Sequence, residues 1–255
     1  MLYDEISVPD ILDRECAHEF LKEATRLASS DELRGIGADL ENKSQLFQRA
    51  LAEDAIADLD RAGLLALLDR IFLVRRKRRA LLESNDFYAL KDAILDLLWG
   101  DEPTSLRFDR FAGRVKGIGE PLVIAFASEL LHFTDPARHW LWTPWIWDAK
   151  TGAGALPLVL NGDGELRGAT LGDTYERVGS ALDVLDGEGR SSGFTALGDG
   201  RFGTDVYLAS VYAVYMFTVF RMRLSKEFNR LLPELPELTR RILGVHRSSK
   251  GSPRA

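Results

Sequence analysis

The 255-residue chain has a single cysteine, Cys16, and this scarcity excludes an internal disulfide and any zinc site built from several thiolates. The longest uncharged apolar run, Val206 to Phe220, contains three tyrosines, a serine and a threonine. It is shorter than the roughly 17 residues of a membrane span. The N-terminal residues show no positively charged stretch followed by an apolar core, so no secretory signal is expected. We therefore expect a cytoplasmic protein without membrane association, in which Val206 to Phe220 forms a buried central helix.

Motifs of nucleotide-binding and acyl-transfer enzymes are also missing. The chain contains no P-loop, no glycine-rich dinucleotide turn and no Gly-x-Ser-x-Gly nucleophile elbow. Cys16 has no histidine and asparagine context that would make it a nucleophile, and we interpret it as a small buried hydrophobic residue. The sequence thus predicts no cofactor and favours a non-catalytic protein.

What is present is an ordinary globular composition with unevenly placed charge. Hydrophobic residues make up 45% of the chain, enough for a sizeable core in one large domain or two small ones. The net charge of −6 hides an acidic segment, 1–60, with 15 acidic and 6 basic side chains. Two basic segments oppose it: 61–100 has 8 basic and 5 acidic side chains, and 221–255 has 9 and 3. A nucleic-acid-binding protein is more often basic overall, so a DNA ligand requires both basic segments to fold onto one face.

The spacing of apolar residues predicts a mainly α-helical, multi-helix globular protein. The predicted helices span Leu12–Leu27, Gln45–Leu59, Leu64–Leu82, Phe87–Trp99, Phe108–Val115, Leu122–Phe133, Thr174–Leu185, Asp205–Leu232 and Leu238–Leu243. Leu156–Leu160 and Glu165–Gly168, which flank a turn rich in glycine and asparagine, indicate a small β-hairpin insertion. The glycine-rich segment Asp186–Gly203 is expected to be a mobile loop.

These features divide one compact unit into five regions. They are an N-terminal helical region, 1–100; a turn and Trp-rich segment, 101–150; the β insertion, a helix and the loop, 151–203; C-terminal helices, 204–245; and a polar tail expected to be disordered, 246–255. The second region carries the most unusual motifs of the chain.

A tight turn, Gly117-Ile118-Gly119, separates the two helices predicted in that region. Backbone N–H groups at the N-terminus of the second helix favour an anion, and Arg114 and Lys116 supply positive charge beside them. Glu120 follows directly, either as a carboxylate that repels phosphate or as an ordinary charge in a first helical turn. The alternative is that the glycines only permit a sharp turn and close helix packing.

Residues 104–150 resemble the helix-hairpin-helix superfamily in the form found in DNA glycosylases. The resemblance rests on Val115-Lys116-Gly117-Ile118-Gly119, on the small-residue helix Ala125-Phe126-Ala127-Ser128 and on the Leu141-Trp142-Thr143 segment that ends at Ile146. It implies a helix-hairpin-helix element that binds the phosphate backbone of DNA. Catalytic members use an aspartate in the later stretch and often a lysine inside the second helix.

At the matching positions this chain has Trp142 and Pro121 or its neighbour Leu122, and the nearby carboxylate, Asp148, comes six residues late. We therefore expect a binding protein without glycosylase chemistry, acting on DNA or a nucleoprotein complex. The basic run Arg75-Arg76-Lys77-Arg78-Arg79 spans more than one helical turn, so at most three of its charges can face one partner. An auxiliary phosphate patch of Arg75, Arg76, Arg78 and Arg79 is one interpretation, and a solvated helix end is the other.

Four of the five tryptophans, Trp140, Trp142, Trp145 and Trp147, lie within eight residues. Such rings anchor protein interfaces or stack on bases, and the rival function is an accessory subunit that binds a protein partner through them and through Tyr207, Tyr212 and Tyr215. The alternative is that the rings pack in the core with each indole N–H bonded locally. The sequence leaves the oligomeric state open.

Two Glu-x-x-His motifs, Glu15/His18 and Glu129/His132, are the remaining candidates. On a helix each motif places a carboxylate and an imidazole on one face, and two copies on facing helices can bind a di-metal centre in a helical bundle. That arrangement requires further carboxylates, so a metal-dependent enzyme is the third hypothesis.

Overall fold

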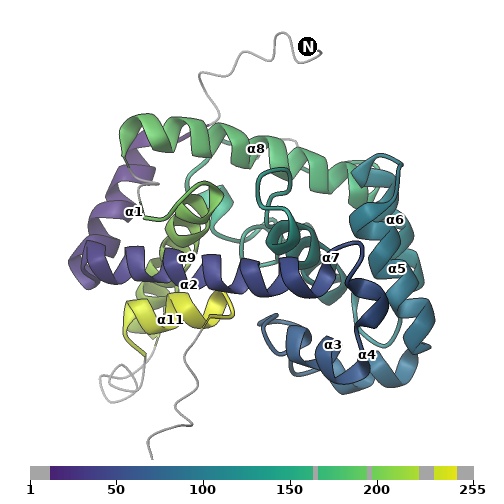
Figure 1. Cartoon of the computed structure of the whole chain (residues 1–255). Helices are drawn as coiled ribbons and strands as arrows, with labels where there is room; N and C mark the ends of the chain where they lie inside the picture. The colour runs from purple at the N-terminus through teal and green to yellow at the C-terminus, as the bar shows by residue number, and fades with distance from the viewer. Residues whose placement is uncertain (1–11, 163–165, 194–196, 224–232, 246–255) are drawn as a thin grey trace, which may run out of the picture.

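Figure 1 shows the computed structural model of the chain, which describes residues 12–162, 166–193, 197–223 and 233–245. Within these residues the protein is built from helices and contains no β-strand, which confirms the mainly α prediction. The helices are α1 (Arg14–Leu27), α2 (Ser30–Leu51), η2 (Ile56–Asp58), α3 (Arg61–Leu68), α4 (Arg78–Ser84), α5 (Phe87–Trp99), α6 (Thr104–Arg114), α7 (Glu120–Thr134), η3 (Leu156–Leu158), α8 (Leu171–Ser192), α9 (Arg201–Arg223) and α11 (Leu235–Ile242).

Helix α7 is the central element of the fold. Its residues from Val123 to Thr134 are all buried, as its nearly continuous apolar sequence predicts. It packs against α2, α5 and α6, while its first residue, Glu120, remains exposed. The turn before α7 is therefore held at the surface by a helix that is fixed in the core.

Helix α9 forms the second buried layer and packs against α1, α2, α8 and α11. Residues 201–219 of this helix are long and apolar enough to cross a membrane by length and composition, but 67% of that window is buried inside the protein. This burial is the packing expected of a core helix, as the sequence predicts for Val206 to Phe220.

Side-chain caps explain where several helices begin. Asp86 accepts a hydrogen bond from Ala89 N and starts α5. Ser29 and Glu32 form a capping box that starts α2 well before the predicted helix 45–59. The predicted helix 64–82 is also divided, because turns at residues 72–77 separate α3 from α4.

The predicted β-hairpin is wrong over the described residues. Leu156–Leu158 forms a 3₁₀ helix, and Leu160 makes an isolated antiparallel bridge with Leu12. The physical reason is tertiary: Ala155 N donates to Trp145 O and Leu156 N to Ile146 O, so this backbone pairs with the Trp segment rather than with a second strand. Part of the predicted turn, residues 163–165, and the tail 246–255 lie outside the described residues.

The predicted loop Asp186–Gly203 is also largely helical. Helix α8 continues to Ser192 and α9 begins at Arg201. Asp186 stabilises the extension of α8. Its carboxylate accepts a hydrogen bond from Thr204 Oγ1 at 2.7 Å and pairs with Arg190, one helical turn later, at 2.7 Å. Cys16 is a further correction, since its side chain is exposed on α1 rather than buried.

Candidate functional site

The turn between α6 and α7 is packed on the C-terminal end of α4. Gly117 has φ +80°, a conformation that favours glycine, and a Cβ atom there would lie 2.8 Å from Ala80 O and still closer to Ser84. Gly117 therefore permits both the sharp turn and its close approach to α4, which are the features named by the packing interpretation. The basic run immediately precedes and enters α4, so the structure brings these two motifs together.

Asn85 fixes the position of the turn. Lys116 N donates to Asn85 Oδ1 at 3.0 Å, and Asn85 Nδ2 donates to Lys116 O at 2.8 Å and to Leu81 O at 2.7 Å. One amide side chain thus ties both backbone groups of Lys116 to the end of α4. Nothing in the sequence indicated this contact, which joins residues 31 positions apart.

The backbone N–H groups of residues 117–120 determine what kind of ligand the turn could bind. Within the described part of the chain, none of these four groups has an intramolecular acceptor. The next residue, Pro121, has no N–H, and the first bonded amides of α7 belong to Leu122 and Val123, which both donate to Gly119 O. The four amides and the positive end of the α7 dipole are thus available to water or to an anion.

Charged side chains around the turn have both signs. Lys116 is exposed, and so is Glu120, whose carboxylate stands in the first turn of α7. Arg114 is half exposed and lies 3.6 Å from Asp96, which also pairs with Arg110 at 2.9 Å. Lys116 is consequently the principal uncompensated cation of the turn, and Arg114 contributes less than the sequence predicts.

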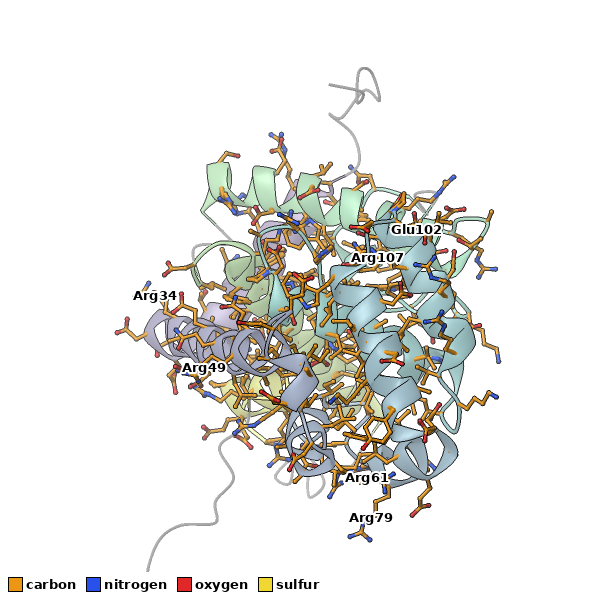
Figure 2. All side chains as sticks on the ribbon, turned by 45° about the vertical axis from the view of Figure 1, so that its right-hand side comes forward. Arg34, Arg49, Arg61, Arg79, Glu102 and Arg107 are labelled. Carbon is orange, nitrogen blue, oxygen red and sulfur yellow. The ribbon has the colours of Figure 1, made fainter. Side chains whose placement is uncertain are left out.

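The arginines of the basic run have different surroundings. Arg76 and Arg79 are exposed (Figure 2 shows Arg79 extending into solvent). Arg78 Nε pairs with Asp69 at 2.9 Å, and its guanidinium also donates to Arg75 O. Arg75 is half-buried and turns toward α2. The patch predicted from Arg75, Arg76, Arg78 and Arg79 is therefore reduced to two exposed arginines.

Arg61 is a cation of this surface that sequence reasoning missed. Its guanidinium donates to Leu82 O at 2.9 Å, near the end of α4, and Figure 2 shows Arg61 and Arg79 at the same corner of the molecule. Its sequence position, at the start of α3, gave no signal because the contact depends on how α3 and α4 pack. We call the surface formed by the turn 115–119, Arg61, Arg76 and Arg79 the basic corner.

The four clustered tryptophans lie in the core. Trp140, Trp142, Trp145 and Trp147 are between 1% and 8% exposed. Trp140 Nε1 donates to Asp183 at 2.7 Å and Trp142 Nε1 to Trp147 O at 2.9 Å. The burial agrees with the packing interpretation, although only Trp142 bonds locally, and it leaves the rings almost no surface with which to contact a partner.

The Glu-x-x-His motifs do not come together as a metal site. Glu15 and His18 are exposed on α1, whereas Glu129 and His132 are buried on α7, and no group of three or more possible ligands occurs in the described residues. Each side chain of the buried motif has another partner. Glu129 accepts from Lys43 Nζ at 2.6 Å, so an ammonium occupies the position that the hypothesis gave to a metal.

Lys43 and Glu129 form a buried ion pair that the sequence did not reveal. Lys43 Nζ also donates to Leu243 O at 2.9 Å and lies 4.0 Å from the centroid of the Phe133 ring. Burial lowers the pKa of Lys43 and raises the pKa of Glu129, and the charge of each partner opposes the shift of the other. The two residues lie 86 positions apart, which explains why no spacing pattern predicts the pair.

His132 continues this buried polar network. Its Nδ1 lies 2.9 Å from His139 O and its Nε2 lies 2.8 Å from Asp205 Oδ2. Both ring nitrogens thus face oxygen atoms, one of the backbone and one of the Asp205 carboxylate. Burial lowers the pKa of the neighbouring His139 to about 4. The network holds α2, α7 and α9 together in the centre of the molecule.

The chain matches no known protein-family model, and comparison with curated proteins and with solved structures gives no significant match. Two features of the described residues could hold a charged ligand. They are the basic corner and a cavity beside α2 that Arg75 lines.

Proposed function

We propose that this protein is a non-catalytic helix-hairpin-helix protein that binds DNA, alone or within a nucleoprotein complex, through the basic corner. In this proposal the amides of residues 117–120 and the Lys116 ammonium hold one stretch of phosphate backbone. Arg76, Arg79 and Arg61 contact neighbouring phosphates. The main support for the proposal is the contact of Gly117 with α4, because this contact places the four amides beside the helix that the exposed arginines adjoin.

Phosphate contacts of this kind position DNA but do not read its sequence. Within the described residues, the basic corner offers no polar side chain whose position identifies it as a reader of base edges. Binding is therefore expected to be independent of sequence, with an affinity in the range of non-specific binders, about 10⁻⁴ to 10⁻⁶ M at physiological salt.

The rival function, a protein partner held by the Trp and Tyr residues, has less surface to support it. The four tryptophans are buried, and so is Tyr207, whose hydroxyl donates to Ala17 O. Tyr212 is half-buried and Tyr215 is 42% exposed, so little of the aromatic surface on which that hypothesis depends is accessible.

Fluorescence anisotropy with labelled duplex and single-stranded DNA tests the proposal. Lys116→Glu is expected to weaken binding at least tenfold, because it replaces an attractive charge beside the phosphate with a repulsive one. Lys22→Glu is the matched control, since Lys22 is exposed and belongs to α1, which lies at the opposite end of the molecule from α4 (Figure 1).

If Lys116→Glu and Lys22→Glu weakened DNA binding equally, the loss would be a general effect of charge. That result would overturn the assignment of binding to the basic corner. Absence of binding by the wild-type protein at low salt would remove DNA as the ligand. In that case a stoichiometric partner recovered by co-purification would become the function to pursue.

A further inference from the structure

A cavity of about 700 Å³ lies between α2, the end of α3 and the chain after α11. Its charged lining residues are Asp39, Lys43, Arg49, Asp69, Arg70 and Arg75. It is separate from the amides of the α6–α7 turn, none of which lines it. Its size lies within the range of about 300–1,000 Å³ that is typical of small-molecule sites.

Helix α2 provides one wall of the cavity. Residues 39, 42, 43, 46 and 49 recur at intervals of three and four, so they share one face of this helix. The opposite side comes from Asp69 and Arg70 at the end of α3 and from Arg75 in the following turn. Arg49 from α2 and Arg70 and Arg75 from the connection between α3 and α4 therefore line one hollow.

The chain after α11 closes the cavity near Lys43. Gly244 has φ +72°, and a Cβ atom there would lie 3.1 Å from Lys43 Nζ and would clash with Arg70 O. This glycine allows the backbone to pass between the lysine and Arg70. The floor of the cavity is consequently a rigid, buried group, since Lys43 is almost completely inaccessible and is bonded to Glu129 and Leu243 O.

The carboxylates of the lining are held by arginines that do not line the cavity. Asp39 accepts from Arg240 Nε at 3.0 Å, and Asp69 pairs with Arg78 Nε at 2.9 Å. Arg49 and Arg70 have no ion pair with a carboxylate in the part of the chain that the structure describes. The cavity therefore keeps an excess of positive charge.

The pKa shifts agree with this crowding of cations. Burial lowers the pKa of Lys43, and the charge of Arg70 lowers it further. Burial together with the charges of Arg76 and Arg241 lowers the pKa of Arg75. Burial is the larger cause of both shifts, and an anion in the cavity beside Arg75 would favour its charged form.

We propose that this cavity binds a small molecule carrying two linked phosphate groups, with Arg49, Arg70 and Arg75 as its ligands. Guanidinium groups form two parallel hydrogen bonds with the oxygens of phosphates and of carboxylates, and a terminal phosphate group offers three such oxygens where a carboxylate offers two. Three such groups suit a ligand with a charge of about −3, as a diphosphate carries. This inference goes beyond the DNA-binding proposal and does not depend on it.

Titration calorimetry of the full-length protein with sodium pyrophosphate tests the inference, and citrate serves as a carboxylate of similar charge. Pyrophosphate is expected to bind with one-to-one stoichiometry, at least about tenfold more tightly than citrate. No binding at millimolar pyrophosphate would overturn the inference. Equal or tighter binding of citrate would overturn the assignment to phosphate.

Matched arginine substitutions locate the site. Arg49→Ala and Arg70→Ala are each expected to weaken pyrophosphate binding about tenfold or more, because each removes a charge-assisted hydrogen bond. Both residues are exposed at the mouth, so alanine leaves the core intact. Arg34→Ala is the control on the same helix, because Arg34 does not line the cavity, and it is expected to have no effect. Equal losses in all three variants, or no loss in any, would contradict the site.

Failure of this inference is distinguishable from failure of the DNA-binding proposal. Lys116→Glu lies on the turn 115–119 and is expected to retain pyrophosphate affinity while losing DNA affinity. Arg49→Ala is expected to show the reverse pattern. If Lys116→Glu reduced pyrophosphate binding as strongly as Arg49→Ala does, pyrophosphate would be binding at the basic corner and the cavity site would be wrong.

Discussion

At the residue scale, the Lys43–Glu129 pair is the most consequential feature of the core. Both charges are removed from water, which costs several kcal/mol per ion and is compensated only by their mutual attraction and by additional hydrogen bonds. Lys43 satisfies this condition through Leu243 O and the Phe133 ring. The pair therefore connects α2, α7 and the chain after α11, and each member depends on the other.

Lys43→Met is expected to lower the free energy of unfolding by about 3–5 kcal/mol at pH 7, because it leaves the Glu129 carboxylate buried without a partner. A second substitution, Glu129→Leu, should recover most of this loss, since it removes the unpaired charge. Urea-induced unfolding followed by circular dichroism measures both effects. If the double variant were no more stable than Lys43→Met, the loss would come from packing and not from the unpaired charge.

The loss of stability in Lys43→Met relative to the wild type is expected to depend on pH. Burial raises the pKa of Glu129 and the Lys43 ammonium opposes this shift, so in Lys43→Met the pKa of Glu129 is raised further than in the wild type. The stability contributed by the protonated carboxyl group is present at low pH and is lost as pH rises, and this loss is larger in the variant. The stability deficit of Lys43→Met relative to wild type should therefore narrow between pH 7 and pH 5. His139 has the opposite effect, because its pKa of about 4 disfavours folding as pH falls, but it is present in both proteins and cancels in the difference.

At the element scale, the sequence predicted features that depend on neighbouring residues and missed those that depend on distant ones. Helices α5, α6 and α7 were predicted closely, because their apolar spacing and the Asp86 cap act within a few residues. The β-hairpin prediction failed because the backbone near Leu156 bonds to the Trp segment. The turn between α6 and α7 was visible as a motif, whereas its attachment to α4 through Asn85 had no local signal.

The turn between α6 and α7 allows a matched test, because its two glycines have different surroundings. Gly117→Ala is expected to lower the free energy of unfolding by about 1–3 kcal/mol, since φ is positive and the methyl group meets α4. Gly119→Ala should change stability by less than about 0.5 kcal/mol, because φ is −75° and the nearest atom, Pro121 Cδ, is 3.9 Å away. Chemical denaturation of the two variants measures the difference, and equal losses would show that the turn is not packed on α4 in solution.

At the scale of the whole molecule, charge limits how the protein can bind DNA. The net charge is −6, and acidic residues also stand near the basic corner: Asp58 ends η2, and Asp60 caps α3 beside Arg61. Long-range attraction of DNA is therefore weak, and binding has to come from a few direct phosphate contacts. The wide separation of the basic segments in the sequence already indicated that attraction of DNA would be weak. Which basic residues lie side by side on the surface depends on the packing of α3, α4 and the turn, and this packing had no signal in the sequence.

The number of phosphate contacts can be measured from the salt dependence of binding. Each contact contributes about −0.9 to the slope of the logarithm of the binding constant against the logarithm of salt concentration. Contacts by Lys116, Arg61, Arg76 and Arg79 predict a slope of about −3.6 for duplex DNA, and Lys116→Ala should change it to about −2.7. Anisotropy titrations over a range of potassium chloride concentrations give both slopes. A slope that stays unchanged in Lys116→Ala would show that the turn does not contact phosphate, because a charge that releases no counterions on binding makes no contribution to the salt dependence.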